Sequence, residues 1–121
     1  MEFKYDKENR LLVMTMTDEI DHHVSEKIRR KADYEIQRYM PKKVIFDLSK
    51  VSFMDSSGIG LIIGRYKVTS LFGGILEIEN ANERVKRILE MSGVLKIIKL
   101  KEEDILNEKY VWKWNEAGIY K

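Results

Sequence analysis

The sequence contains no cysteine, and Pro41 is the only proline among its 121 residues. Without cysteine, neither disulfide bonds nor thiolate chemistry is possible, and a cytoplasmic location is the natural expectation. The single proline leaves no proline-rich linker, and no internal repeat or low-complexity tract marks a second domain. The length therefore predicts one domain, large enough for a two- or three-layer core.

Long apolar segments and a concentrated charge of one sign are missing as well. The longest uncharged stretch starts at Val51, is interrupted by Asp55 and ends at Gly64, short of the roughly 18 apolar residues that span a membrane. The start of the chain, MEFKYDKENR, is charged where a signal peptide needs an apolar segment. The net charge is +2, from 22 basic and 20 acidic residues mixed along the chain. We therefore expect no membrane partner and, without a basic stripe, no direct contact with nucleic acid.

Short strand patterns alternate with helical patterns along the chain. Apolar alternation predicts an antiparallel strand pair over residues 2–7 and 10–17, and further strands are predicted over residues 44–48, 75–78 and 94–100. Helical spacing predicts helices over residues 22–39, 56–70, 82–92 and 101–114. An initial strand pair followed by alternating helices and strands is typical of an α/β layered domain with a mixed sheet.

Residues with capping preferences stand at the ends of these helices. Asp21 is expected to cap the first helix, and Asn80 or Asn82 to cap the third. Gly93 is expected to end the third helix in a left-handed conformation.

The segment VSFMDSSGIGLIIGRYK, residues 51–67, carries the most informative pattern. Its glycines read G-x-G-x-x-x-G, which is one residue off the dinucleotide fingerprint and too far from the preceding strand to serve as one. A serine nucleophile would need a base, and the only histidines are the neighbours His22 and His23. Adjacent helical residues point roughly 100° apart, so the two rings suit neither this role nor a shared metal ion.

The same segment also fits the start of a helix. Asp55 or Ser56 can serve as its N-cap. The apolar residues at i, i+3, i+4 and i+7 predict one buried face, made of Ile59, Ile62, Ile63 and Tyr66. Two interior glycines, Gly60 and Gly64, cost about 1 kcal/mol each relative to alanine. We therefore expect another backbone to approach them closely, belonging either to a neighbouring strand or to a partner protein.

A serine at an exposed helix start can also be a site of modification. A phosphate there would meet free backbone amides and the positive end of the helix dipole. It would add a charge of about −1.5 to −2 beside Asp55, which could abolish the docking of a partner. The residues alone permit this interpretation but do not select it over structural capping.

Three segments resemble the anti-sigma factor antagonists of Gram-positive sporulation, which are small cytoplasmic STAS domains. These are EIDHH at residues 19–23, FMDSSGIGLIIGRYK at 53–67 and MSGVLKIIKL at 91–100. The resemblance covers about residues 1–105 and implies a single STAS-like α/β domain, with a mixed sheet of about five strands and four helices packed mainly on one face. Residues 106–121 form a C-terminal extension.

The extension has two interpretations. A helical continuation would pack Leu106, Tyr110 and Trp114 on the domain at i+4 spacing, and this is the one we favour. An exposed aromatic tail would instead mediate self-association or docking. We expect a monomer or a weak dimer.

The resemblance implies a binding switch and not an enzyme, with no catalytic residue, cofactor or metal. In this family the serine after the motif aspartate, here Ser56, is phosphorylated by the anti-sigma factor, which is a serine/threonine kinase. The unphosphorylated antagonist binds this kinase and releases a sporulation sigma factor. The phosphorylated form dissociates from the kinase, and a serine phosphatase restores the unphosphorylated form.

The resemblance also implies a partner-binding surface. It comprises Asp21, Asp55, Ser56, Ser57, Gly58 and Gly60. Asp55 would help to place the serine, and Ser57 would be a cap and not the phosphoacceptor. Asp18 stands where the family usually has glycine, which could alter the loop. The alternative function is a STAS scaffold or sensor module that is never phosphorylated and binds a small ligand or a multiprotein complex.

Overall fold

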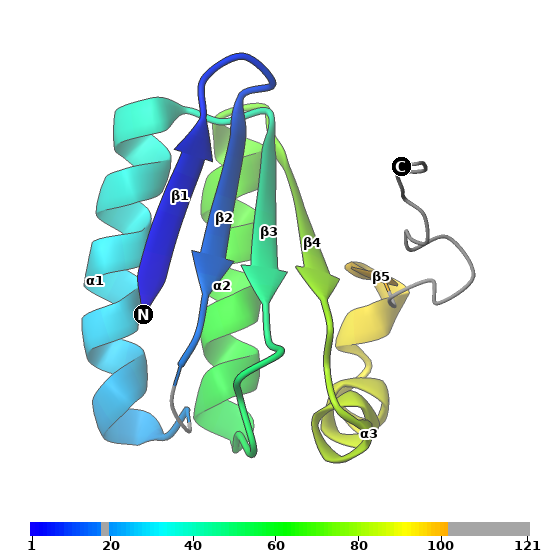
Figure 1. Cartoon of the computed structure of the whole chain (residues 1–121). Coiled ribbons are helices and arrows are strands. Elements are labelled where there is room, and N and C mark those ends of the chain that lie inside the picture. The colour runs from blue at the N-terminus through cyan, green and yellow to red at the C-terminus, as the bar shows by residue number, and fades with distance from the viewer. Residues whose placement is uncertain (18–19, 102–121) are drawn as a thin grey trace, which may run out of the picture.

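The chain folds around one five-stranded sheet, seen in a computed structural model that describes residues 1–17 and 20–101 (Figure 1). Its strands are β1 (Glu2–Asp6), β2 (Leu11–Thr15), β3 (Lys43–Asp47), β4 (Ile75–Glu79) and β5 (Lys99–Lys101), in that spatial order. The β1–β2 pair is antiparallel, and the remaining pairs are parallel. The predicted mixed sheet and the α/β class are confirmed.

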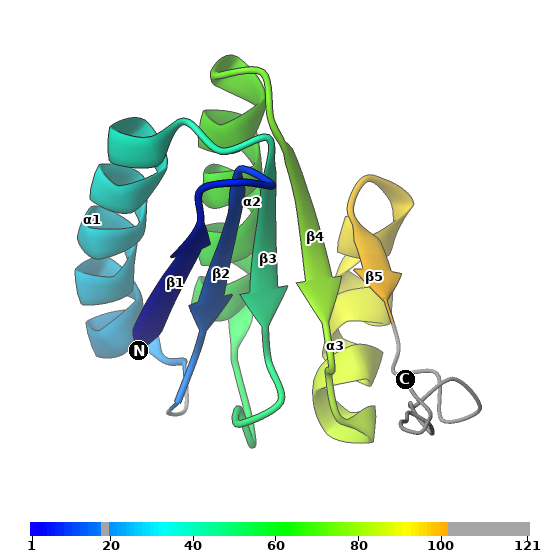
Figure 2. The ribbon, with the colours of Figure 1, turned by 45° about the horizontal axis from the view of Figure 1, so that its top comes forward.

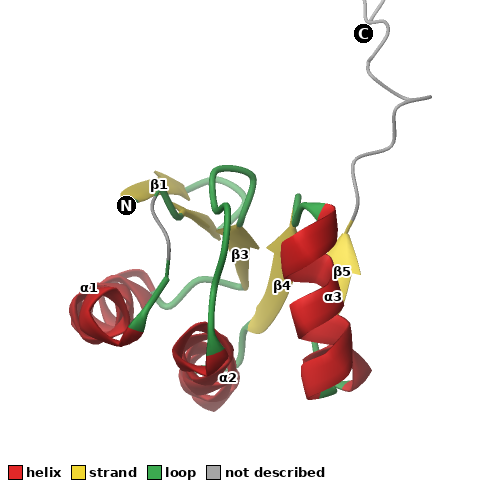
Figure 3. Ribbon diagram, turned by 90° about the horizontal axis from the view of Figure 1, so that it is seen from below, coloured by secondary structure: helices red, strands yellow, loops and turns green. Residues whose placement is uncertain are grey.

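Helices connect the parallel strands. They are α1 (His22–Tyr39), α2 (Ser56–Leu71) and α3 (Glu83–Ser92), followed by the short 3₁₀ helix η1 (Val94–Lys96). Helices α1 and α2 lie side by side on one face of the sheet, whereas α3 lies beside β4 and β5 (Figures 2 and 3). No helix in the described part of the chain has the length and apolar character to cross a membrane.

The core fills the space between the sheet and the helices. Along each central strand, buried residues alternate with half-buried ones, because successive side chains point to opposite faces. The fully buried side chains of this core include Leu12, Met14, Ala32, Ile36, Val44, Phe46, Ile62 and Ile78. The sheet and both covering helices therefore share one apolar layer.

The ends of the helices follow the capping rules. The side chains of Asp21 and Asn82 accept hydrogen bonds from the amides of Val24 and Val85, so both act as N-caps as predicted. Gly93 ends α3 with φ 83°, in the left-handed region that glycine adopts without strain. These local predictions are confirmed.

The predicted last strand is wrong in its first half. Residues 94–96 form η1, closed by hydrogen bonds from the amides of Ile97 and Ile98 to the carbonyl of Val94, at 3.1 and 2.9 Å. Val94 and Ile98 are buried, whereas Ile97 is 54% exposed. An apolar run in which positions i and i+4 are buried follows a helical period, so only Lys99–Lys101 join the sheet.

The predicted buried face of α2 is displaced around the helix. Its buried residues are Gly58, Leu61, Ile62, Arg65 and Thr69, whereas Ile59, Ile63 and Tyr66 are only half-buried. Helix α1 packs along one flank of α2 and covers Leu61 and Arg65. The other three residues lie on the opposite flank, given about 100° of rotation per residue.

Several predictions fall outside the described residues. The helix expected over residues 101–114 begins with Lys101, which belongs to β5, and the rest of it lies beyond the described range. The extension over 106–121 and the substituted loop position Asp18 also lie outside it. Three α-helices are present in the described part, and the fourth stays a prediction.

Candidate functional site

The starts of α1 and α2 are held next to each other at the carboxyl end of the parallel strands (Figure 1). Ile20 and Met54, which precede the two helices, form an isolated parallel bridge and are fully buried. The amide of Ile20 donates to the carbonyl of Phe53 at 3.2 Å, and the amide of Asp55 donates to the carbonyl of Ile20 at 3.3 Å. Because bridged backbones lie roughly 5 Å apart, Asp21 and Asp55 follow at neighbouring positions.

Both aspartates act as N-caps. The Oδ1 atom of Asp21 accepts from the amide of Val24 at 3.0 Å, and the Oδ1 atom of Asp55 accepts from the amide of Ser57 at 2.8 Å. Asp55 is therefore the cap of α2, and the expectation that Ser57 is a cap is wrong because its amide is the capped group. Each carboxylate also lies at the positive end of a helix dipole, where a negative side chain stabilises the helix.

Ser56 is the first residue of α2 and is exposed. Within the described residues its hydroxyl has no hydrogen-bond partner. Ser57 is half-buried and turns toward α1. Of the two neighbouring serines, Ser56 is thus the more exposed to an approaching protein.

The glycines of α2 occupy two different environments. Gly58 is buried, and a Cβ atom there would lie 3.0 Å from Cβ and Sδ of Met54 and 3.2 Å from Cγ2 of Ile20. A Cβ atom on Gly60 or Gly64 would meet no heavy atom within 4 Å in the described part of the chain. The expected close approach of a neighbouring strand is therefore wrong, and the approach of a partner stays a prediction.

The loop before α2 is supported by residues that follow the neighbouring strand β4. The side-chain amide of Asn82, the cap of α3, donates to the carbonyl of Val51 at 2.9 Å. Asn80 donates to Oδ1 of Asp47 at 3.2 Å. These contacts fix the path of residues 48–55, which carries the chain from β3 to Asp55.

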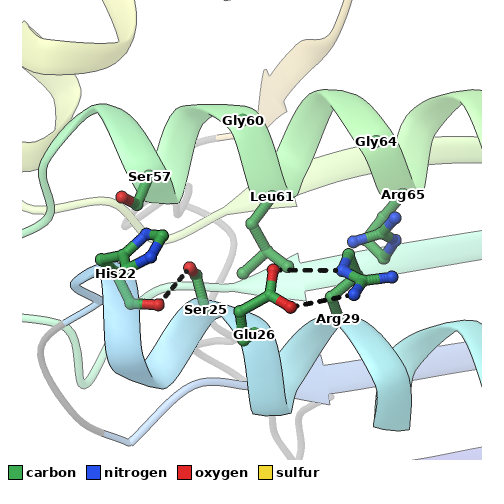
Figure 4. Close-up of a pocket in the computed structure, with 9 residues that line it drawn as sticks. All are labelled: His22, Ser25, Glu26, Arg29, Ser57, Gly60, Leu61, Gly64 and Arg65. Atoms are coloured by element: carbon green, nitrogen blue, oxygen red, sulfur yellow. Dashed lines mark hydrogen bonds and ion pairs between the residues drawn. The ribbon is translucent and has the colours of Figure 1, made fainter.

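A groove of about 310 Å³ lies between α1 and α2 (Figure 4). Nine residues line it: His22, Ser25, Glu26, Arg29, Ser57, Gly60, Leu61, Gly64 and Arg65. Ser57 and His22 lie toward one end, and Arg65 and Arg29 lie toward the other. Both histidines are exposed at the start of α1, and no three His, Asp or Glu side chains of the described residues converge as metal ligands would.

The charges of the groove form two ion pairs. On its rim, Oε1 of Glu26 lies 2.9 Å from Nη2 of Arg29. The hydrogen bond from Arg29 holds the pKa of Glu26 below its usual range, and the same pair raises the pKa of Arg29. Both side chains are about half exposed, so solvent screening keeps this pair weak.

The second pair is buried. Arg65 is 5% exposed, and its Nε atom lies 2.6 Å from Oδ1 of Asp33 on α1. The N–H group does not point at this oxygen, so the contact is ionic and not a well-aligned hydrogen bond. Burial lowers the pKa of the Arg65 guanidinium, although the charge of Asp33 opposes this. The Nη1 atom of Arg65 is also buried and has no hydrogen-bond partner in the described residues.

Sequence reasoning missed this groove, its buried arginine and the anchors Ile20 and Met54. The groove is built from two helices that are distant in sequence, so no local spacing predicts it. One signal was present, because Arg65 follows Leu61 at i+4 and so places a charge on the buried stripe of α2.

The fold and the site define a small α/β domain in which an exposed serine is the first residue of one of two adjacent, capped helices. Comparison with known proteins identifies the family of this α/β domain. The chain belongs to the STAS domain family, whose model matches residues 2–104.

Its relatives include anti-sigma factor antagonists. The anti-sigma F factor antagonist of Paenibacillus polymyxa is 37% identical over 95 residues, which cover 78% of this chain and 81% of that protein. The solved structure of the anti-sigma factor antagonist SpoIIAA in its unphosphorylated form matches with a TM-score of 0.72 and 27% identity, over 89% of this chain and 93% of that one. The phosphorylated form of the Bacillus cell fate determinant SpoIIAA matches with a TM-score of 0.65 and 25% identity, over 89% and 96%.

Proposed function

We propose that this protein is an anti-sigma factor antagonist controlled by phosphorylation. In its unmodified form it binds an anti-sigma factor that is also a serine kinase, and this releases a sporulation sigma factor. Phosphorylation of Ser56 ends the complex, and a serine phosphatase restores the binding form. The protein acts by binding and is not an enzyme.

The position of Ser56 carries this proposal. Its hydroxyl is exposed and unpartnered within the described residues, at the first position of α2. The capping aspartates Asp21 and Asp55 lie next to it, after the bridged residues Ile20 and Met54. Relatives named as anti-sigma factor antagonists, and a similar structure solved in a phosphorylated form, support the same role.

In the proposed modification, Ser56 is acted upon. Its Oγ atom forms a bond to the γ-phosphorus of ATP, the bond from that phosphorus to the bridging oxygen breaks, and ADP leaves. The proton of the hydroxyl passes to a base of the kinase. The Ser57 amide donates to Oδ1 of Asp55, which fixes the first turn of α2, and Ser56 is exposed in this turn.

The phosphate would change binding through its charge. At the start of α2 it meets the positive end of the dipole, so the domain itself tolerates it. It adds about −1.5 to −2 charges next to two carboxylates on the proposed contact surface. A mismatched charge in an interface costs several kcal/mol, and each 1.4 kcal/mol changes affinity about tenfold.

The test combines modification with binding. The protein is incubated with its cognate anti-sigma kinase and ATP, and added phosphate is located by mass spectrometry. We expect phosphate on Ser56, no modification in Ser56→Ala with binding retained, and a loss of affinity of about 100-fold or more in Ser56→Asp.

Ser57→Ala is the matched control and should be modified like the parent protein. The absence of phosphate, or phosphate on Ser57 alone, would refute the assignment of Ser56. If Ser56→Asp binds as tightly as the parent, the electrostatic account of release is wrong.

A second candidate function is a sensor module that binds a small ligand and is not phosphorylated. One observation favours it, the groove between α1 and α2 with its buried arginine. Ligand binding in the groove would itself be compatible with phosphorylation of Ser56, because Ser56 does not line this groove.

A further inference from the structure

The buried end of the groove between α1 and α2 holds a cation whose hydrogen-bonding capacity is not used. A guanidinium group carries five N–H donors. In the described residues, Asp33 is the only ion-pair partner of Arg65, and the buried Nη1 atom has no acceptor. A buried charged donor without a partner loses its hydration without compensation. Nη1 and Nε are both closed off, so Nη2 is the guanidinium nitrogen that an acceptor oxygen from outside can reach.

We propose that this groove binds a small molecule through its anionic group, a carboxylate or a phosphate, held against Arg65. The site is separate from Ser56 and does not depend on the proposed phosphorylation. Arg65 lines the groove from α2, and its guanidinium lies between the two helices (Figure 4). The ligand oxygen would enter from the groove and accept a hydrogen bond from Nη2, the guanidinium nitrogen that is not buried.

Two glycines make the room for such a ligand. Gly60 and Gly64 line the groove, and a Cβ atom on either would meet nothing within 4 Å. Any larger residue would project into this open space. The volume of about 310 Å³ lies at the lower end of the roughly 300–1,000 Å³ found for small-molecule sites. A compact acid of a few carbon atoms is therefore the expected class.

The opposite end of the groove offers neutral polar groups. The hydroxyl of Ser57 and the imidazole of His22 lie there, away from the two arginines (Figure 4). They suit a hydroxyl or carbonyl oxygen at the far end of the ligand. Eight residues of helix separate Ser57 from Arg65, about 12 Å at 1.5 Å per residue, so acetate and lactate would both use only the arginine end.

The other charges predict a weak site in the unaltered protein. Glu26 already pairs with Arg29, and Asp33 pairs with Arg65, so these four groups sum to zero before a ligand binds. Affinity in the millimolar range is therefore expected. For the same reason, removing either carboxylate should tighten binding, because an arginine loses its internal counter-ion.

The test uses the full-length, isotope-labelled protein and amide NMR. Acetate, lactate, succinate and inorganic phosphate are titrated at constant ionic strength, with sodium chloride as the control for screening. We expect saturable shifts of the Gly60 and Gly64 amides and of the Arg65 side-chain N–H. Lactate and acetate should bind with similar affinity, because both are too short to reach beyond the arginine end.

Four variants locate the site. Asp33→Asn and Glu26→Gln should each tighten binding several-fold. Gly64→Ala should weaken it at least tenfold, since the added methyl group occupies the groove while the fold is kept. The double variant Asp33→Asn with Arg65→Met should abolish the shifts, and it leaves no carboxylate without its partner.

Several results would overturn the proposal. These are the absence of saturable shifts, equal shifts with chloride, and shifts that persist in the double variant. Binding of the anti-sigma factor that depends on Arg65, without binding of any free anion, would assign the groove to a carboxylate of a protein partner instead. Failure of Ser56 phosphorylation would leave these titrations unchanged, so the two proposals fail independently.

Discussion

Helix α2 contains two kinds of glycine, and their comparison separates the structural part of the site from its open part. Gly58 is buried against Ile20 and Met54, where a side chain has no room. Gly60 and Gly64 face the groove, where a side chain would meet nothing. In this helix, glycine allows close packing in the first turn and leaves the groove open along the next turns.

The difference shows that the cost of glycine in a helix is compensated in two ways. At Gly58 the compensation lies inside the molecule, because close packing on two buried side chains stabilises the fold. At Gly60 and Gly64 no such contact exists in the described residues, so any compensation must come from something that binds. Substitutions at these positions test the distinction directly.

Gly58→Val should have the largest effect. Its side chain would collide with Met54 and Ile20, and overpacking of this kind costs about 3 kcal/mol of unfolding free energy. Urea unfolding followed by circular dichroism measures the loss. Gly60→Val is the matched control and should change stability by less than about 1 kcal/mol, because valine is no worse than glycine in an open helix position. Equal losses in both variants would contradict the comparison.

Asp55→Ala should have an intermediate effect. Loss of the hydrogen bond to the Ser57 amide removes the N-cap of α2 and costs about 1 kcal/mol. Hydrogen exchange at the Ser57 amide should accelerate more than exchange at Gly64, which lies beyond the first turn. Asp55→Asn keeps an N-cap oxygen and should retain most of the stability. If Asp55→Asn loses as much as Asp55→Ala, the charge and not the cap is responsible.

Gly64→Ala should have the smallest effect, and of opposite sign. Alanine loses less backbone entropy than glycine on folding, so the variant should gain about 0.5–1 kcal/mol. Thermal unfolding would record a higher midpoint. A destabilised variant would mean that part of the chain packs on this position.

Local rules were sufficient for much of the fold. Asp21, Asn82 and Gly93 have the predicted capping roles because each depends only on a few neighbouring residues. The order of strands and helices also follows from local periodicity. The segment from Val94 to Ile98 was misassigned because a short apolar run fits a strand or a helical turn equally well.

Long-range features were beyond sequence reasoning. The Arg65–Asp33 pair joins two helices, and no spacing rule connects residues so far apart. The burial of Leu61 in place of Ile59 depends on where α1 lies beside α2, which is set by the packing of both on the sheet. The helix start with Asp55 and Ser56 could therefore be predicted from sequence, whereas the groove beside it could not.

The bridge between Ile20 and Met54 affects the stage of synthesis and folding at which a partner can recognise the protein. It joins a residue before α1 to a residue before α2, so it requires β2 and β3 to be paired and both helices to be docked. In a chain still being synthesised, Asp21 is made long before Asp55 and has no fixed distance to it. A partner that needs both carboxylates at once would therefore ignore nascent or unfolded copies and respond only to finished molecules.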